Sequence, residues 1–308
     1  MLSICIAIHN WDVNALVNEL VKQADRLEKP YEVILLDDAS DHEFQMKNSQ
    51  LDFLEHVTYL QSYINMGRSY VRNVLAARAK YPYLLFMDCD TRVTHKDYLK
   101  KYIDLLPAQV LSGGYEYKSR RPRKDSVLRW AYGRERETCS AKKRNKNPNY
   151  SFSTFNFLIE KKIFDIVQFD ETLEGYGHED TLFGLDLLSH GIIVRHIDNP
   201  LRHDVSITTS RFLKQTENAI DNLLVIQEKV ADKEQFRSSI SLLRHYDKLK
   251  KTNTLRFFLK FYKKFEKRII ANLKSTHPNM RCFDLYKLNY LSHIIENSNG
   301  NQETKRRK

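Results

Sequence analysis

The sequence predicts an α/β fold, with a mostly parallel sheet covered by helices on both faces and a helical extension at the C-terminus. Short apolar, β-rich runs alternate with segments of helical periodicity, and polar residues gather where the apolar runs end. Strands are expected at residues 2–8, 31–38, 57–61, 84–87 and 110–117, with helices after the first strand, over 66–80 and near 95–105. From about residue 205 the pattern is mostly helical, and the polar tail 298–308 is expected to be disordered.

Length and composition indicate one large globular domain with room for an appendage. The chain has 308 residues, of which 42% are hydrophobic, and its apolar runs are shorter than the roughly 20 residues that span a bilayer. The first residues read directly as a strand, without the basic segment of a signal peptide. The four cysteines lie far apart without a CxxC pair, which argues against a zinc site and suits a reducing cytoplasm.

The net charge of +11 is unevenly distributed. Residues 118–147 carry a net charge of +9 and residues 205–308 a net charge of +12, so the rest of the chain is acidic. Acidic clefts bind cations, while basic flanks attract phosphates, anionic lipid or nucleic acid. The basic segment 118–149 has little periodicity, which favours a mobile loop or lid.

The run LLFMDCD delivers a predicted buried strand to Asp88 and Asp90. Two carboxylates one residue apart repel each other unless a cation or a proton compensates. Their spacing suits a hard divalent ion that keeps substrate phosphates in its shell, although an ordinary strand-end turn fits the spacing equally well. Four further polar residues fall at strand ends, where ligands bind in such sheets: His9, Asn10, Asp37 and Asp38.

The order of motifs then points to a family. IAIHN, VILLDDAS, NMGRSYVRN and LLFMDCD together resemble the N-terminal half of GT-A-fold family 2 glycosyltransferases. The segment from FNFLIEKK to GLDLLSHG resembles their acceptor half, and its GYGHED resembles a motif of β-1,4-galactosyltransferases and of chondroitin-polymerase-like bacterial enzymes. The resemblance implies a GT-A domain over 1–204, with a nucleotide-binding half (1–117), the basic loop (118–149) and a catalytic half (150–204). The basic helical extension, 205–308, is not covered.

The resemblance implies a metal-dependent, inverting glycosyltransferase. It would move a galactose-, N-acetylgalactosamine- or glucose-type sugar from UDP to a saccharide or lipid-linked saccharide acceptor. Asp88 and Asp90 would hold Mn2+ or Mg2+ on the diphosphate, with Asp90 the surer ligand and Asp88 shared with ribose. His203 would complete the metal shell, with His196 and Asp204 as weaker candidates.

The remaining family positions imply the donor site and the catalytic acid pair. Asp38 would accept the uracil imide hydrogen, because a carboxylate is an acceptor only. Asp180 would be the base, and Glu179 would bind sugar hydroxyls, although a helix cap with surface acids is the plainer explanation of such a pair. The other donor contacts implied are His9 and Asn10 at the base, Arg68 and Arg72 at the nucleotide or the acidic corner, Asn156 beside the sugar and Tyr176 stacking on it. Arg72 could also pair with Asp38 or Asp90.

Residues 255–274 form a basic amphipathic helix with one apolar stripe. This pattern is typical of a helix at an anionic membrane surface, and equally of a helix packed on its own domain. A cytoplasmic protein, peripheral at the inner membrane, would follow from the first possibility; no nucleic-acid module is recognisable. Two other functions stay open: an inactive nucleotide-sugar-binding relative, and a nucleotidyltransferase, which would need a Gly-rich loop that IAIHNWD lacks.

Overall fold

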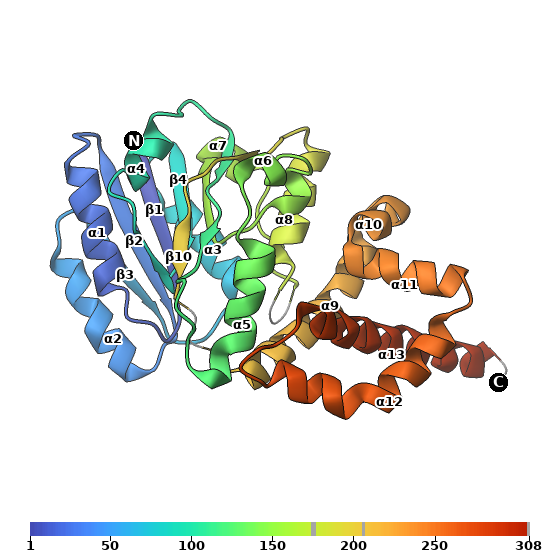
Figure 1. The fold of residues 1–308 in the computed structure, drawn as a ribbon. Helices are drawn as coiled ribbons and strands as arrows, with labels where there is room; N and C mark the ends of the chain where they lie inside the picture. Colours follow the sequence, from blue (N-terminus) through green and yellow to red (C-terminus); the bar gives the residue numbers. More distant parts are fainter. Residues whose placement is uncertain (174–176, 205–206, 307–308) are drawn as a thin grey trace. The chain divides into compact units, whose positions relative to one another are not determined.

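The structure is a computed structural model that describes residues 1–173, 177–204 and 207–306, with side chains up to residue 297. It divides into two compact units (Figure 1). The first comprises residues 1–119, 133–174 and 179–204, and the second comprises 120–132, 175–178 and 205–308. Each unit is described separately below.

The first unit is built on a seven-stranded sheet of order β3-β2-β1-β4-β8-β6-β9. Its strands are β1 (Leu2–Ile8), β2 (Tyr31–Asp38), β3 (Val57–Ser62), β4 (Tyr83–Asp88), β6 (Val110–Ser112), β8 (Asn156–Glu160) and β9 (Arg195–His196). All neighbours are parallel except β8, which runs antiparallel to both β4 and β6. This confirms the predicted mostly parallel sheet, in which β1 lies between β2 and β4.

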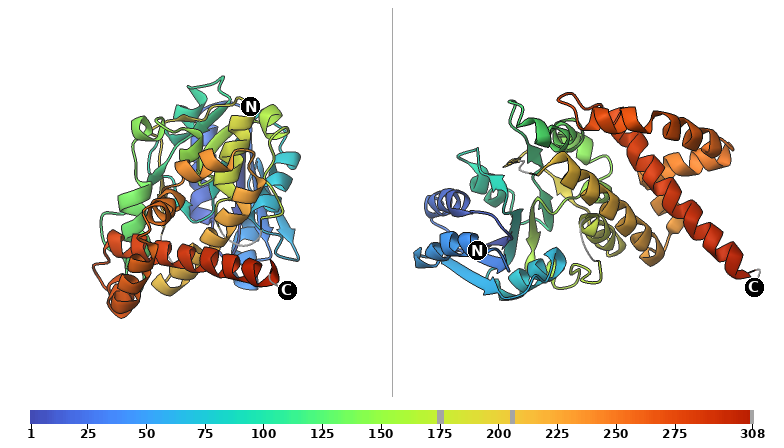
Figure 2. Two further views of the ribbon diagram at one scale, coloured as in Figure 1. Left: turned by 90° about the vertical axis from the view of Figure 1, so that its right-hand side faces the viewer. Right: turned by 90° about the horizontal axis from the view of Figure 1, so that it is seen from below.

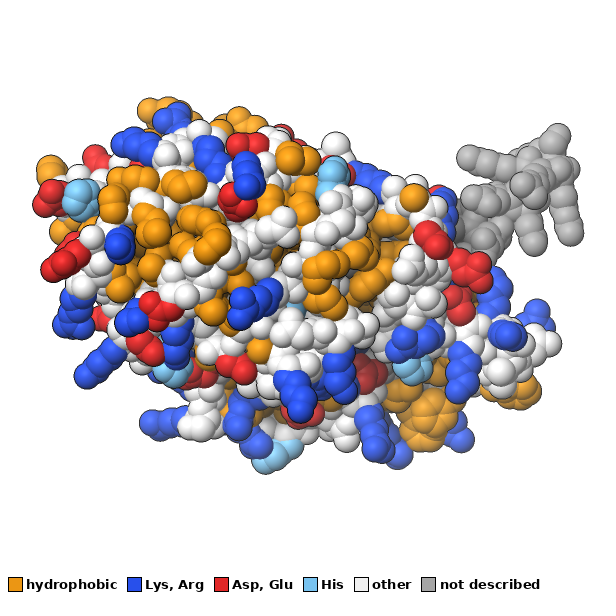
Figure 3. Space-filling view, turned by 90° about the horizontal axis from the view of Figure 1, so that it is seen from above, with side chains coloured by type: hydrophobic (Ala, Val, Ile, Leu, Met, Phe, Trp, Pro, Cys, Tyr) orange, Lys and Arg blue, Asp and Glu red, His pale blue; other side chains and the backbone are white. Residues whose placement is uncertain are grey.

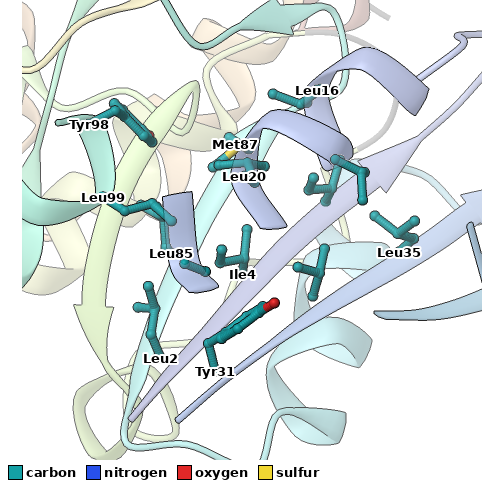
Figure 4. Close-up of a cluster of buried hydrophobic side chains, with 14 of the residues drawn as sticks. Leu2, Ile4, Leu16, Leu20, Tyr31, Leu35, Leu85, Met87, Tyr98 and Leu99 are labelled. Carbon is teal, nitrogen blue, oxygen red and sulfur yellow. The ribbon is translucent and has the colours of Figure 1, made fainter. Parts of the chain in front are cut away.

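Alternate residues of the central strands enter two separate cores. On one face, Ile4 and Ile6 of β1 pack against α1 (Asn14–Asp25) and α4 (Tyr98–Ile103), as Figure 4 shows for Leu16, Leu20 and Leu99. On the other face, Cys5 of β1 joins a cluster contributed by α3 (Arg68–Arg78), α7 (Lys161–Phe164) and α8 (Glu179–Ser189). Burial on both faces explains why these strands read as continuous apolar runs. Between β2 and the edge strand β3 the chain forms α2 (His42–Ser49) and the short helix Gln50–Phe53.

The strand predicted over 110–117 is two strands in two sheets. Gly113 and Gly114 interrupt it: Gly114 has φ +91°, and a Cβ at Gly113 would lie 2.4 Å from the Asn156 side chain. The chain therefore leaves the large sheet after Ser112 and enters a second sheet of order β5-β10-β7. Its strands are β5 (Thr91–Arg92), β7 (Tyr115–Glu116) and β10 (Leu201–His203).

Residues 118–149, expected to form a mobile loop or lid, include several short helices. The segment contains α5 (Val127–Tyr132), α6 (Ala141–Arg144) and the short helical turns 124–126, 133–137 and 149–151. Leu128 is fully buried in the second unit, and Arg144 is buried in the first, where its guanidinium donates to the backbone oxygens of Gly113 and Ile197. A buried arginine whose hydrogen bonds are accepted by backbone carbonyls produces no periodic apolar pattern, so the sequence did not indicate the regular structure of this segment.

The second unit is helical, as predicted for the C-terminal region. It contains α9 (Thr209–Lys229), α10 (Lys233–Ser239), α11 (Ser241–Lys251), α12 (Leu255–Leu273) and α13 (Met280–Arg306). Figure 2 shows α13 as one long helix, which extends to Arg306 and so includes most of the segment expected to be disordered. Gln, Glu, Lys and Arg are good helix formers, and one glycine costs only about 1 kcal/mol.

The apolar stripe predicted on 255–274 lies inside this second unit. Tyr262, Ile269 and Leu273 are buried in a cluster with Phe212 of α9 and Phe283 of α13. This helix is thus amphipathic because it packs on its own domain. Among the residues that the structure describes, no helix is long and apolar enough to cross a membrane.

Candidate active site

The polar strand ends meet at one edge of the large sheet. In the parallel register, Ile8 of β1 lies beside Asp37 of β2, and Ala7 of β1 lies beside Asp88 of β4. The residues that follow these strands therefore collect at their carboxyl ends, where the strand order changes direction about β1. The sequence predicted this convergence for His9, Asn10, Asp37, Asp38, Asp88 and Asp90.

Asp37 and Asp38 both organise backbone. Asp37 is fully buried, and its oxygens accept from the backbone N–H of Ser40 (2.7 Å) and the hydroxyl of Tyr59 (2.9 Å). The Asp38 carboxylate accepts from the backbone N–H groups of Met66 (2.7 Å) and Gly67 (3.0 Å). Gly67 itself has φ +86°. Asp38 thus fixes the turn that opens α3, and each oxygen retains one lone pair for a ligand.

His9 and Asn10 form the turn after β1. The exposed imidazole of His9 hydrogen-bonds through Nδ1 to the backbone oxygen of Asp38 at 2.9 Å. Asn10 has φ +50°, and its Oδ1 accepts from the backbone N–H of Asp41 at 2.6 Å. The Asn10 side chain is therefore a clamp between two loops, whereas His9 presents an exposed ring face beside Asp38.

A buried arginine connects the β4 corner to the acid pair of α8. The Arg72 side chain is 4% exposed; its Nη2 lies 2.8 Å from Oδ1 of Asp88 and its Nη1 lies 3.7 Å from Oε1 of Glu179. Arg68, one turn earlier on α3, donates to the same Glu179 oxygen at 3.3 Å. The guanidinium carbon of Arg72 also lies over the Phe169 ring, 5.5 Å from its centroid. Arg72 thus pairs with Asp88, where the sequence suggested Asp38 or Asp90.

The two acids at the start of α8 titrate differently. Burial acts to raise the pKa of the Glu179 carboxyl, but Arg68 and Arg72 outweigh it and hold that pKa below its usual range. Burial, and then the charge of Glu179, raise the pKa of Asp180 to about 7. The nearest donor to Asp180 is local: the backbone N–H of Thr181 lies 2.7 Å from Oδ1. One acid is thereby kept ionised, while its neighbour exchanges a proton near neutral pH.

The small sheet brings Asp90 and His203 together. His203 on β10 pairs in register with Thr91 on β5, and the backbone N–H of Asp204 donates to the backbone oxygen of Asp90 at 2.9 Å. As a result, Nε2 of His203 lies 2.9 Å from Oδ2 of Asp90. An imidazole nitrogen and a carboxylate oxygen converging on one point are donors that Mn2+ accepts.

This donor set fits a cation that takes part of its shell from a substrate. Within the described residues, no group of three His, Cys, Asp or Glu side chains is arranged to hold a metal. One oxygen of Asp88 is engaged with Arg72, so Asp90 and His203 are the two side chains that converge at this corner, beside the second oxygen of Asp88. A hard ion with one or two carboxylate ligands usually completes its shell with phosphates and water.

The weaker metal candidates have other partners. His196 is buried; its Nδ1 accepts from Nε of Arg144 (3.1 Å), and its Nε2 lies 2.8 Å from the Pro148 oxygen. Asp204 contacts the Arg92 guanidinium and lies 3.0 Å from the Lys118 ammonium. Burial opposes ionisation of Asp204, but these two cations hold its pKa below the usual range. Neither side chain is available to an ion.

The prediction that Asn156 contacts the donor sugar is wrong. This side chain is 1% exposed, and its Oδ1 accepts from the hydroxyls of Tyr98 and Tyr102, each at 2.7 Å. Its Nδ2 donates to the backbone oxygens of Gly114 (3.2 Å) and Asn199 (2.9 Å). With all four hydrogen bonds made inside the protein, Asn156 joins the two sheets. Tyr176 lies outside the described residues.

Sequence reasoning missed the aromatic surroundings of His203. Tyr117 and Phe155 contact the imidazole edge-on, with ring centroids 5.5 Å and 5.4 Å away. Tyr115 stacks on Phe155 at 4.0 Å. Alternating tyrosines after a Gly-Gly pair were the available signal, but they read as an ordinary strand. On the face shown in Figure 3, Lys and Arg side chains lie among acidic and hydrophobic ones.

Comparison with known proteins locates the chain among them. The model of the family described as glycosyl transferase family 2 matches residues 3–166, more than half of the 308 residues. No curated protein matches. The matched range ends before GYGHED, so the galactosyltransferase-like character of that motif stays a prediction.

Solved structures share the architecture at low sequence identity. S. aureus TarS (residues 1–349) is 17% identical with a TM-score of 0.52, over 97% of this chain and 91% of that one. The mannosyltransferase PcManGT of Pyrobaculum calidifontis, solved with GDP-Man and Mn2+, is 12% identical with a TM-score of 0.53, over 80% and 69%. Glucosyl-3-phosphoglycerate synthase of Mycobacterium tuberculosis, solved with Mn2+, UDP and phosphoglyceric acid, is 13% identical with a TM-score of 0.50, over 73% and 78%. These likenesses, with the family match, confirm the predicted GT-A fold.

Proposed function

Because the chain belongs to glycosyl transferase family 2, we propose that it moves a sugar from a UDP-sugar to a saccharide hydroxyl with inversion, using a divalent metal ion. The sugar would be of the galactose, N-acetylgalactosamine or glucose type, and the acceptor a saccharide or lipid-linked saccharide. The observation that carries this proposal is the network Asp88–Arg72–Glu179, which ties the acid-x-acid corner to the acid pair through one buried cation. A strand-end turn and a helix cap, taken separately, do not require such a link.

Asp180 is the base in this proposal. In its ionised form its carboxylate takes the proton of the acceptor hydroxyl while that oxygen bonds to the anomeric carbon. The bond from that carbon to the diphosphate oxygen breaks, UDP departs with the electron pair, and Asp180 later returns the proton to water. A base with a pKa of about 7 matches neutral working conditions, since half of it is ionised there and its proton affinity is high.

Asp90 and His203 would hold the metal ion at the diphosphate. When bound, the ion supplies positive charge that stabilises the departing diphosphate. Arg72 holds Asp88 at the side of this corner, which leaves Asp88 one oxygen for ribose or metal. His9, the Asn10 backbone and the remaining lone pairs of Asp38 would face the uracil base.

The decisive experiment measures nucleotide release from a panel of UDP- and GDP-sugars with Mn2+ or Mg2+, in the presence of oligosaccharide acceptors. We expect UDP release from one sugar class, and loss of release with retained UDP binding in Asp180→Asn. Asp165→Asn, an exposed acid in the same unit, is the matched control and should keep full activity. Tight UDP binding without release from any donor would favour an inactive relative and refute the proposal.

The metal assignment has its own measurement. Calorimetry of Mn2+ binding with UDP present should show at least a tenfold loss of affinity in His203→Ala, since a direct ligand contributes more than the 10–100-fold of an outer-shell group. His190→Ala, an exposed histidine of the same unit, should bind Mn2+ as the native protein does. Equal affinity in both variants would remove His203 from the metal site.

For a lipid-linked acceptor we propose contact with an anionic membrane through the outer face of α12. With the predicted stripe buried, a second stripe remains: Phe257 is 73% exposed and Phe261 is 49% exposed. Phe261 lies 4.8 Å from the ring of Phe265, over which Lys264 and Arg268 extend. The exposed cations of this helix are Arg256, Lys260, Lys263, Lys264, Lys267 and Arg268, against one acid, Glu266. Each is worth about 1 kcal/mol near an anionic surface.

Sedimentation with vesicles tests this contact. The protein should pellet with phosphatidylglycerol vesicles at low salt and stay in solution with phosphatidylcholine alone. Replacing Phe257 and Phe261 by serine should weaken binding severalfold, because aromatic side chains enter the interface. Phe53→Ser, which removes a 90% exposed phenylalanine from the other unit, is the control. Equal sedimentation of all three proteins would exclude α12 as the contact.

A further inference from the structure

The hydrogen bonds around His203 form a chain of four groups in the first unit. Oδ2 of Asp90 lies 2.9 Å from Nε2 of His203, and Nδ1 of the same ring lies 3.1 Å from the Tyr117 hydroxyl. The Tyr117 hydroxyl in turn contacts the Glu137 carboxylate. Tyr117 follows β7 directly and Glu137 ends the turn at 133–137, so two segments with no other role in the site converge on the imidazole.

The donor–acceptor rules give this chain a direction. A carboxylate only accepts hydrogen bonds, so the Tyr117 hydroxyl must donate its one hydrogen to Glu137. The Tyr117 oxygen can then only accept, which requires a hydrogen on Nδ1 of His203. Without a bound cation Nε2 also donates, because Oδ2 of Asp90, 2.9 Å away, only accepts; a cation bound beside both atoms would take the place of that second hydrogen and leave Nδ1–H unchanged.

We propose that Tyr117 and Glu137 are positioning residues that hold His203 as an Nδ1–H imidazole, with Nε2 presented to a divalent cation beside Asp90. The inference rests on the metal site of the proposed function and adds two residues that the family resemblance did not supply. In metal sites, an outer group that fixes the tautomer and ring orientation of a histidine contributes about 10–100-fold to metal affinity.

The packing around Tyr117 supports a fixed position for its hydroxyl. The residue is 8% exposed, and its ring is parallel to that of Tyr115, with centroids 6.4 Å apart. A Cβ at Gly133 would lie 2.2 Å from Cζ of Tyr117, so the ring lies directly against the backbone there. Phe155 limits rotation of His203 from the other side. The imidazole thus has little freedom to turn its other nitrogen toward Asp90.

Two readouts besides turnover test the inference. With Mg2+ and UDP bound, nitrogen-15 NMR should show His203 as the Nδ1–H tautomer, identified by the absence of its signal in His203→Ala. Calorimetry with UDP should show Mn2+ affinity about 10-fold lower in Tyr117→Phe, which keeps the ring and loses only the hydroxyl. Glu137→Gln, which still offers an acceptor oxygen, should lose less than Tyr117→Phe.

Tyr115→Phe is the matched control, since the Tyr115 hydroxyl bonds to Ser153 and not to His203. It should bind Mn2+ as the native protein does. Native Mn2+ affinity in Tyr117→Phe, or an Nε2–H tautomer in the native protein with Mg2+ and UDP bound, would overturn the inference. If His203→Ala itself keeps native Mn2+ affinity, the proposed metal site fails instead, so the two failures are distinguishable. Gly133→Ala, which displaces the Tyr117 ring, should reproduce the loss seen in Tyr117→Phe.

Discussion

Replacing Asp180 by asparagine should stabilise the first unit at alkaline pH while abolishing sugar transfer. An acid whose pKa is raised in the folded state binds its proton more tightly there than in the unfolded chain. Ionisation therefore costs folding free energy, and stability falls as pH rises from the ordinary value of 3.8 to about 7, above which this loss is complete. Asparagine keeps the Oδ1 acceptor for the Thr181 N–H but has no proton to lose.

The size of the effect follows from the shift. At about 1.36 kcal/mol per pKa unit, a shift of roughly three units corresponds to about 4 kcal/mol as an upper limit. The Asp180 residue retains some solvent exposure, so water screens part of this cost. We expect the stability advantage of Asp180→Asn over the native protein to be small near pH 4 and to reach about 2–3 kcal/mol near pH 8.

Urea unfolding can isolate the unit concerned. The protein has two tryptophans, Trp11 in the first unit and Trp130 in the second, so a Trp130→Phe background makes fluorescence report on the first unit. The unfolding free energies of Asp180→Asn and of the parent are compared at both pH values, with Asp165→Asn as an exposed-acid control. An advantage of equal size at both pH values would refute the reasoning, because an uncharged packing effect does not depend on pH.

Three other substitutions give further checks. Glu179→Gln removes a charge that raises the pKa of Asp180, so the acidic pKa of the kcat/KM profile should move from about 7 to a lower value. An unchanged pH–rate profile would contradict this coupling. Arg72→Ala leaves Asp88 without its buried partner and should cost about 3 kcal/mol in urea unfolding, with Arg72→Lys intermediate; equal stability of all three would exclude a structural ion pair. Gly67→Ala should lower the unfolding free energy by about 1–2 kcal/mol, because its φ of +86° disfavours any Cβ, although no atom of the described residues would lie within 4 Å of that Cβ. Gly184 is not a suitable control, because a Cβ there would clash with the backbone oxygen of Asn149.

The fold and the gathering of acids could be predicted from sequence because both follow from local pattern. Buried parallel strands are continuous apolar runs, and their polar ends must meet at one edge of the sheet. The pairing of Asp90 with His203, separated by 113 positions, was suggested by the family order of motifs and is present at 2.9 Å. The assignment of either residue to a metal remains a proposal.

The errors arose where a side chain works inside the protein instead of at its surface. Asn156 was assigned to the donor, yet it is consumed by four internal hydrogen bonds, and sequence does not reveal which way a strand residue points. Arg144 and Leu128 order a segment that lacks periodicity. On α12, one stripe was read correctly as apolar, but only the structure separates the buried residues from the exposed Phe257 on the opposite face.

The charges of the first unit explain why an ionised glutamate stands beside the proposed base. Arg68 and Arg72 keep Glu179 negative, and that charge raises the pKa of Asp180. Arg72 also acts directly to lower the pKa of Asp180, so the base responds to two opposing influences of one cation. Since the same guanidinium holds Asp88, any charge that alters the Asp88–Arg72 pair also alters the field at Glu179. Binding of a cation at the β4 corner and the basicity of Asp180 are therefore electrostatically linked within one unit.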